Sequence, residues 1–147
     1  YYEADELSVI IKNNARKMSL NMDEQALMEI ASRSRGTPRI ANRILRRVRD
    51  FALVEQVDLI GKQISNDALK LMDIDELGLD SMDRKILNVI QEHYSGGPVG
   101  IEALSATLGE DKQTIEEVYE PYLLKKGLLL RTPRGRTLSQ TAIDHIK

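Results

Sequence analysis

An arginine at the start of a capped helix is the feature of this sequence best suited to bind phosphate. Thr37 has the side chain of an N-cap, Pro38 fits the first helical position, and Arg39 follows directly. The first turn of a helix leaves backbone N–H groups without partners and carries about half a positive charge. An arginine there adds a planar fork of donors that matches phosphate oxygens. The spacing therefore predicts an anion site at this helix start.

Three more arginines follow on the same helix. At about 100° per residue, the four guanidinium-bearing positions fall within an arc of about 100°, and an apolar stripe occupies the face toward a core. The arginines are Arg39, Arg43, Arg46 and Arg47, and the stripe is Ile40, Ile44, Val48, Phe51 and Ala52. No Asp or Glu occurs between Ile30 and Arg49, so the usual i,i+4 acidic partners are missing. The alternative is an ordinary solvated basic face, and the roles of the last three arginines stay open.

A second group of arginines surrounds a turn near the end of the chain. Arg131, Arg134 and Arg136 flank or occupy the turn Pro133-Arg134-Gly135, which joins two strand candidates, and no acid occurs between Glu120 and Asp144. Arginines on a projecting hairpin can contact DNA phosphates or the minor groove, so all three are DNA-binding candidates. The alternative is that basic residues here only blunt a sheet edge.

The elements that position these residues fall into two halves. The first half predicts four helices, at residues 4–18, 23–34, 38–56 and about 66–74, with Ser65 as the N-cap of the fourth. The second half predicts helices at 81–94, 101–108 and 114–126, strands at 128–131 and 136–138, and a last helix from 140. Few pattern signals occur between Asp75 and Asp80, so we expect domains at 1–75 and 76–147.

Three helices followed by a hairpin are the order of a winged helix-turn-helix. The helix in the recognition position argues against reading of DNA bases, because acids pushed into the major groove would repel the phosphates that line it. Between positions 110 and 126 its acids are Glu110, Asp111, Glu116, Glu117 and Glu120, set against Lys112, Lys125 and Lys126. We therefore expect DNA contact without sequence specificity.

Composition is that of a globular protein. The chain has 147 residues, of which 41% are apolar and 30% charged, and its 21 basic and 23 acidic side chains give no overall basic surface for nucleic acid. No apolar run approaches the roughly 20 residues of a membrane span, which favours a cytoplasmic location. Without cysteine, and with two histidines far apart, no metal site is predicted.

Several of these motifs resemble one protein family. The run RGTPRIANRILRRVRDFA at 35–52 is similar to the small ATPase domain of the RuvB family, bacterial motors that drive branch migration of Holliday junctions. The segments at 82–85, 96–100, 120–123 and 131–136 resemble the head domain of that family, in the same order. The resemblance covers essentially the whole chain. It implies a mainly α fold, with a four-helix AAA+ lid followed by a winged-helix domain that has a small β-hairpin.

The resemblance also implies roles for particular residues. Tyr2 matches a tyrosine near the adenine of bound ATP or ADP, and Arg39 matches the sensor-2 arginine near the terminal phosphates. Arg131 and Arg136 match residues that contact DNA, and Lys112 matches a basic DNA-contacting position. From the sequence alone, the tyrosines at positions 1 and 2 are equally consistent with a disordered or core-packed terminus, and Lys112 with a plain surface lysine.

The chain itself lacks the machinery of ATP hydrolysis. It has no GxxxxGK[ST] loop and no strand that ends in paired acids for magnesium, so we expect it to be an inactive fragment of a larger ATPase. In the family, the missing large domain holds Mg and ATP, and a homohexameric ring surrounds double-stranded DNA at Holliday junctions and works with RuvA and the RuvC resolvase. The alternative is a free-standing winged-helix module for DNA binding or protein docking, without a link to nucleotide.

Overall fold

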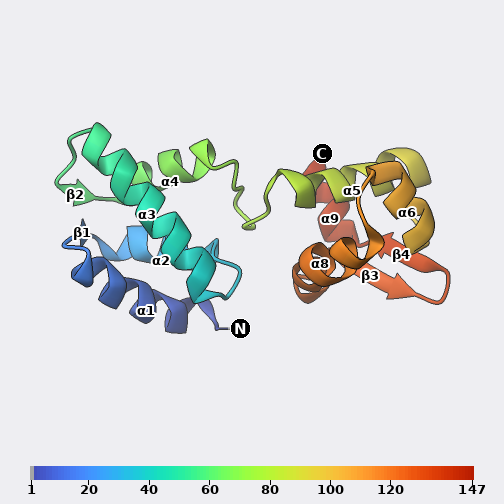
Figure 1. The fold of residues 1–147 in the computed structure, drawn as a ribbon, viewed down its shortest axis with the longest axis horizontal. Coiled ribbons are helices and arrows are strands. Elements are labelled where there is room, and N and C mark those ends of the chain that lie inside the picture. Colours follow the sequence, from blue (N-terminus) through green and yellow to red (C-terminus); the bar gives the residue numbers. More distant parts are fainter. Residues whose placement is uncertain (1) are drawn as a thin grey trace. The chain divides into compact units, whose positions relative to one another are not determined.

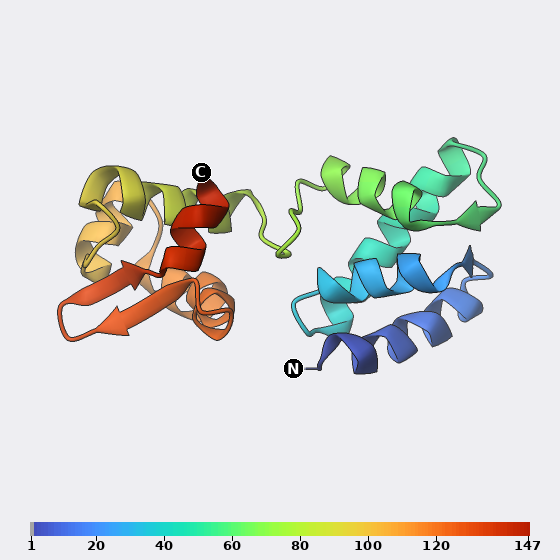
Figure 2. The same ribbon diagram turned by 180° about the vertical axis from the view of Figure 1, so that it is seen from behind.

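The computed structural model describes residues 2–147, so Tyr1 lies outside the described part of the chain. It divides into two compact units, Tyr1–Asp80 and Ser81–Lys147, each with its own buried apolar residues. Figures 1 and 2 show the elements of both units from opposite sides.

The first unit is a four-helix bundle, as the sequence predicts. Two strands of two residues each, which the sequence pattern does not predict, pair in parallel beside the helices. The elements are α1 (Ala4–Lys17), β1 (Asn21–Met22), α2 (Glu24–Ser32), α3 (Pro38–Val54), β2 (Leu59–Ile60) and α4 (Lys62–Leu71).

The core of this unit confirms the predicted apolar stripe of α3. Ile44 and Val48 are fully buried, Ala52 is nearly so, and the partly buried Ile40 and Phe51 pack against the same cluster. Burial of this face turns the arginines of α3 away from the core.

Ser65 does not cap the fourth helix, so that prediction is wrong. The helix α4 begins at Lys62 with Gly61 as its N-cap, and the side chain of Ser65 is fully buried inside the helix. The pairing of β2 with β1 delivers the chain to the helix start at Gly61, earlier than the local pattern indicates. Backbone pairing thus sets this boundary, and a capping side chain does not.

The second unit has the predicted order of helices and strands. Its elements are α5 (Ser81–Tyr94), α6 (Ile101–Leu108), α7 (Lys112–Thr114), a π-helical segment η1 (Ile115–Tyr119), α8 (Glu120–Lys125), β3 (Leu129–Thr132), β4 (Gly135–Leu138) and α9 (Gln140–Ile146). The segments α7, η1 and α8 follow one another without a break and replace the single helix predicted at 114–126. Fully buried Ile86, Ile90, Leu104 and Leu123 form part of the core.

The hairpin β3–β4, called the wing below, is tight and well supported. Arg131 pairs with Arg136 and Thr132 with Gly135 across the antiparallel strands. Arg136 also exchanges two backbone hydrogen bonds with Val99, at 2.7 and 2.9 Å. In both ribbon views the turn lies at the edge of its own unit (Figures 1 and 2). The wing is therefore anchored at one side and open at its tip.

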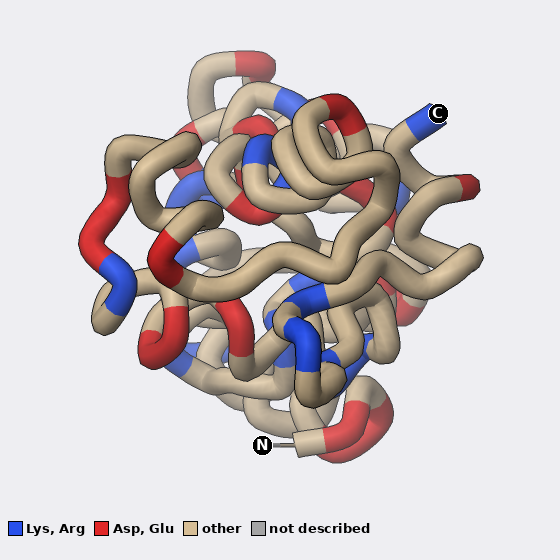
Figure 3. Tube along the Cα trace, turned by 90° about the vertical axis from the view of Figure 1, so that its right-hand side faces the viewer, with Lys and Arg blue, Asp and Glu red and all other residues tan. Residues whose placement is uncertain are grey.

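Charged residues of both signs are mixed along the backbone (Figure 3). No helix within residues 2–147 has the length and apolar character needed to cross a bilayer.

Candidate functional sites

The start of α3 has the geometry that the sequence predicts for an anion site. Thr37 is the N-cap, its Oγ1 accepts a hydrogen bond from the backbone N–H of Ile40 at 3.3 Å, and Pro38 is the first helical residue. The side chain of Arg39 is exposed and has no hydrogen bond or ion pair to any residue between 2 and 147. Its guanidinium is therefore available to a ligand at the positive end of the helix.

Tyr2 lies at the same end of the bundle. Its backbone N–H donates to the carbonyl oxygen of Gly36 at 2.8 Å, so the segment before α1 is held against the turn that precedes α3. The residue is 44% exposed. The fold thus places the backbone of Tyr2 beside the turn that leads into α3, although Tyr2 and Arg39 are far apart in the sequence.

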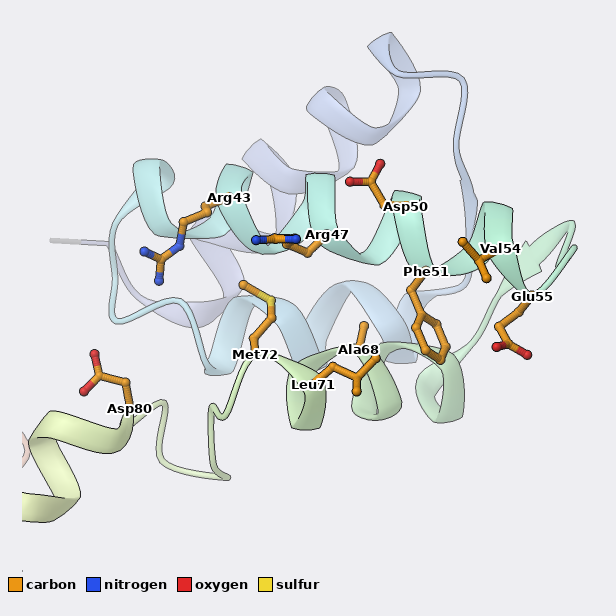
Figure 4. Close-up of a pocket in the computed structure, with 10 residues that line it drawn as sticks. All are labelled: Arg43, Arg47, Asp50, Phe51, Val54, Glu55, Ala68, Leu71, Met72 and Asp80. Atoms are coloured by element: carbon orange, nitrogen blue, oxygen red, sulfur yellow. The ribbon is translucent and has the colours of Figure 1, made fainter.

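The other arginines of α3 do not share one surface. Arg43 and Arg47 line a groove of about 690 Å³ between α3 and α4, whose apolar wall includes Phe51 and Met72 (Figure 4). Arg46 lines a different hollow beside α1, together with Lys17. A single predicted arc of arginines is therefore divided between two surfaces in the structure.

Two of the three wing arginines meet at a buried carboxylate. Arg136 binds Glu120 through two hydrogen bonds, from Nε to Oε2 at 2.8 Å and from Nη2 to Oε1 at 3.1 Å, and Arg131 donates from Nη2 to Oε1 at 3.0 Å. The side chain of Glu120 is 0% exposed, that of Arg136 is 12% exposed and that of Arg131 is 50% exposed. Glu116 lies farther out, 3.9 Å from Arg131 and 3.8 Å from Arg136. We call Glu120, Arg131 and Arg136 the wing clamp.

The charges of the wing clamp stabilise one another. Burial alone would raise the pKa of Glu120, but hydrogen bonds and attraction from Arg136 and Arg131 outweigh it and hold this pKa below its ordinary value. The hydrogen bond to Glu120 in turn raises the pKa of Arg136. Glu120 and Arg136 are therefore both charged at neutral pH.

A widened helix turn places Glu120 under the wing. The N–H of Glu120 bonds to the carbonyl oxygen of Ile115, the i−5 spacing of a π-helix. Pro121 follows, and a proline ring inside a regular α-helix clashes with the carbonyl four residues earlier, here that of Glu117. The π turn accommodates Pro121 and directs Glu120 inward.

This role of Glu120 could not be predicted from helical periodicity. The prediction that Glu120 is one of the exposed acids that would repel DNA is wrong, because the residue is buried and paired. The Glu-Pro pair in the middle of a helical pattern is the signal that could have indicated a special position.

Arg134 and Lys112 are the remaining DNA candidates. Arg134 is exposed at the turn, where its backbone N–H donates to Thr132 Oγ1 at 3.2 Å; its side chain has no partner among residues 2–147. Lys112 is exposed, and its Nζ donates to Glu102 Oε1 at 2.8 Å, a hydrogen bond that raises the pKa of the lysine. The tip of the wing therefore carries a cation free to meet a phosphate.

Both units match domains of one known family. Residues 2–75 match the family described as the RuvB AAA lid domain, and residues 76–147 match the RuvB C-terminal winged helix domain. The chain belongs to the RuvB family. It is thus mainly helical, a RuvB lid followed by a winged-helix domain, as the sequence motifs indicate.

Curated and solved relatives agree with this assignment. The chain is 51% identical over 146 residues to the Holliday junction branch migration complex subunit RuvB of Oleidesulfovibrio alaskensis, covering 99% of the chain and 46% of that protein. It is 50% identical to the subunit of the same name from Protochlamydia amoebophila, covering 44% of that protein. The structure of Thermotoga maritima RuvB, a Holliday junction branch migration motor, superposes with a TM-score of 0.96 at 49% identity, over 99% of this chain and 49% of that one. The chain spans about half the length of these RuvB proteins.

Proposed function

We propose that this chain is the nucleotide-sensing and DNA-gripping part of an ATP-dependent motor that drives branch migration of Holliday junctions in recombination and DNA repair. The observation that carries the proposal is the match of the whole chain, at about half identity, to proteins that bear that name. In this proposal residues 1–75 are the lid and residues 76–147 are the head.

The lid senses the nucleotide through Arg39 and Tyr2. The exposed guanidinium of Arg39 and the first turn of α3 bind the terminal phosphates of ATP, and Tyr2, held against Gly36, lies near the base. A nucleotide-binding domain of the longer protein holds the rest of ATP or ADP with its Mg. Loss of the terminal phosphate releases Arg39 and α3, and this movement passes to the head.

The head grips DNA through its wing. Arg134 at the tip and the exposed part of Arg131 offer donors to backbone phosphates, and Arg136 and Lys112 complete the contact surface. Contacts with phosphate carry no sequence information. This suits a translocase, which must release every step regardless of sequence.

In this proposal the longer protein assembles as a homohexameric ring and acts in the cytoplasm with RuvA and the RuvC resolvase. The relatives named as subunits of a branch migration complex support this view of a multi-protein assembly.

We expect the 147-residue chain to hydrolyse no ATP on its own. It offers one sensor arginine but no phosphate-binding loop, and phosphoryl transfer needs both positioning and a held metal ion. The measurement is phosphate release by the purified chain, with and without duplex DNA. Sustained turnover above the buffer background would contradict the proposed division of labour.

Loss of two exposed wing arginines is expected to weaken DNA binding. Arg131→Ala and Arg134→Ala together remove two phosphate contacts. The magnitude of the slope of log affinity against log salt concentration should therefore decrease by about 1 to 2, and the affinity at low salt should decrease about tenfold. Arg136 is left in place because its loss would strand the buried carboxylate of Glu120.

Fluorescence anisotropy of labelled duplex DNA, titrated with the 147-residue chain at several salt concentrations, measures both quantities. The matched control is Lys85→Ala, which removes an exposed cation of α5 outside the wing. If the double variant and Lys85→Ala bind DNA equally well, the wing is not the gripping element.

A further inference from the structure

The wing places two like charges directly opposite each other. Arg131 and Arg136 are cross-strand partners, an arrangement that destabilises a hairpin when nothing compensates it. Glu120 compensates it by accepting hydrogen bonds from both guanidinium groups. A residue of α8, far from the strands in sequence, thus sets the conformation of two side chains on the wing.

Glu120 fixes orientation as well as charge. Its carboxylate binds Arg136 at two points, the geometry that holds a planar guanidinium most firmly. The partly exposed Glu116 is 3.8 Å or more from both arginines and makes no hydrogen bond to either. Glu120 therefore fixes the orientation of the guanidinium groups, whereas Glu116 only adds negative charge nearby.

The clamp leaves donors free. A guanidinium has five N–H groups, and Arg131 uses a single nitrogen toward Glu120 while half of its side chain is exposed. Arg131 can therefore keep its bond to Glu120 and still donate to a phosphate. Such a preorganised donor loses less side-chain entropy when DNA binds.

We propose that Glu120 is a positioning residue for DNA binding, which holds Arg131 and Arg136 in the orientation in which the wing meets backbone phosphates. This inference rests on the proposed function of the wing. The negative charge of Glu120 alone would weaken the binding of DNA, which is also negatively charged. In this inference Glu120 instead strengthens DNA binding, because it orients the two arginines.

Substitution of the two glutamates separates position from charge. Glu120→Gln and Glu116→Gln each remove one negative charge from the same cluster, so long-range attraction to DNA rises equally in both. We expect Glu116→Gln to bind duplex DNA about two- to fivefold more tightly than the original chain does. Glu120→Gln should bind with about a third of the original affinity or less. Opposite signs for the two variants support a positioning role.

Glu120→Asp provides a variant in which no charge changes. Its carboxylate is one methylene shorter and cannot reach both guanidinium groups in the same geometry, so we expect a loss of affinity comparable to that in Glu120→Gln. This variant also keeps an acid beside Arg136, which protects the fold if Glu120→Gln does not give a stable protein. Circular dichroism and thermal unfolding identify the temperature range in which every variant is folded.

All variants are compared in the 147-residue chain by anisotropy with duplex DNA, across a salt series. Tighter binding by Glu120→Gln, equal to that of Glu116→Gln, would overturn the positioning role, and so would unchanged binding by Glu120→Asp. In either case the wing still grips DNA if the variant lacking Arg131 and Arg134 side chains binds weakly. If that variant binds normally, the wing function and the role of Glu120 fail together.

Discussion

Gly135→Ala is expected to remove most of the stability of the winged-helix unit. Gly135 has φ of +129°, a conformation that residues with a side chain rarely adopt. An added Cβ would lie 2.5 Å from the carbonyl carbon of Val99 and 2.9 Å from the backbone nitrogen of Gly100. Backbone strain and overpacking together cost about 3 to 5 kcal/mol, against a total stability of about 5 kcal/mol or somewhat more for a small domain.

The consequence extends to the proposed DNA contacts. Gly135 follows the turn and pairs with Thr132, and the next residue, Arg136, is bonded through its backbone to Val99. To admit a Cβ, the wing must move away from Val99, which also displaces Arg136 from Glu120. We therefore expect weaker DNA binding along with lower stability.

Denaturant unfolding, followed by far-UV circular dichroism and fitted as two transitions for the two units, measures the effect. The matched control is Gly100→Ala, because Gly100 has φ of −73° and an added Cβ there meets nothing within 4 Å. That variant should lose at most about 1 kcal/mol. Equal midpoints for the two variants would show that the approach of the wing to Val99 does not limit stability.

Local signals explain why much of the fold could be predicted from the sequence. The N-cap at Thr37 with Pro38 behind it, and the apolar stripe of α3, depend only on residues close in the chain, and all appear in the structure. The wing could also be predicted from local sequence, because Pro133-Arg134-Gly135 lies between two short apolar or β-forming runs and specifies a turn. Resemblance to a family then added two candidate residues that local patterns do not indicate, Tyr2 and Lys112, and their roles stay predictions.

Contacts between distant segments explain what could not be predicted. The start of α4 depends on pairing between β1 and β2, and neither two-residue strand has a pattern of its own. The wing clamp joins Glu120 to partners 11 and 16 residues away and requires a π turn before Pro121. Helical periodicity assumes a regular α-helix, so a residue that follows a π turn is assigned to the wrong face.

Arg39→Ala, introduced into the longer motor protein that we propose for this chain, is expected to abolish ATP-driven branch migration while DNA binding persists. The exposed guanidinium of Arg39 extends from the first turn of α3, where no residue among 2–147 competes for it. Removing one preorganised donor from a reacting phosphate lowers turnover about 100-fold or more. The wing lies in the other unit, so the phosphate contacts proposed for it are not removed by this substitution.

The assay is ATP-dependent strand separation of a synthetic Holliday junction, with ATP hydrolysis and junction binding measured on the same preparations. Arg46→Ala is the matched control, because it removes an exposed arginine of the same helix, about two turns beyond its N-terminus, that has no partner among residues 2–147. We expect this control to retain most branch migration. Unaltered branch migration by Arg39→Ala would exclude the sensor role and favour a winged-helix module that works without nucleotide. Equal losses in both variants would instead assign the effect to the charge of α3 as a whole, because the positive end of a helix acts only within its first turn.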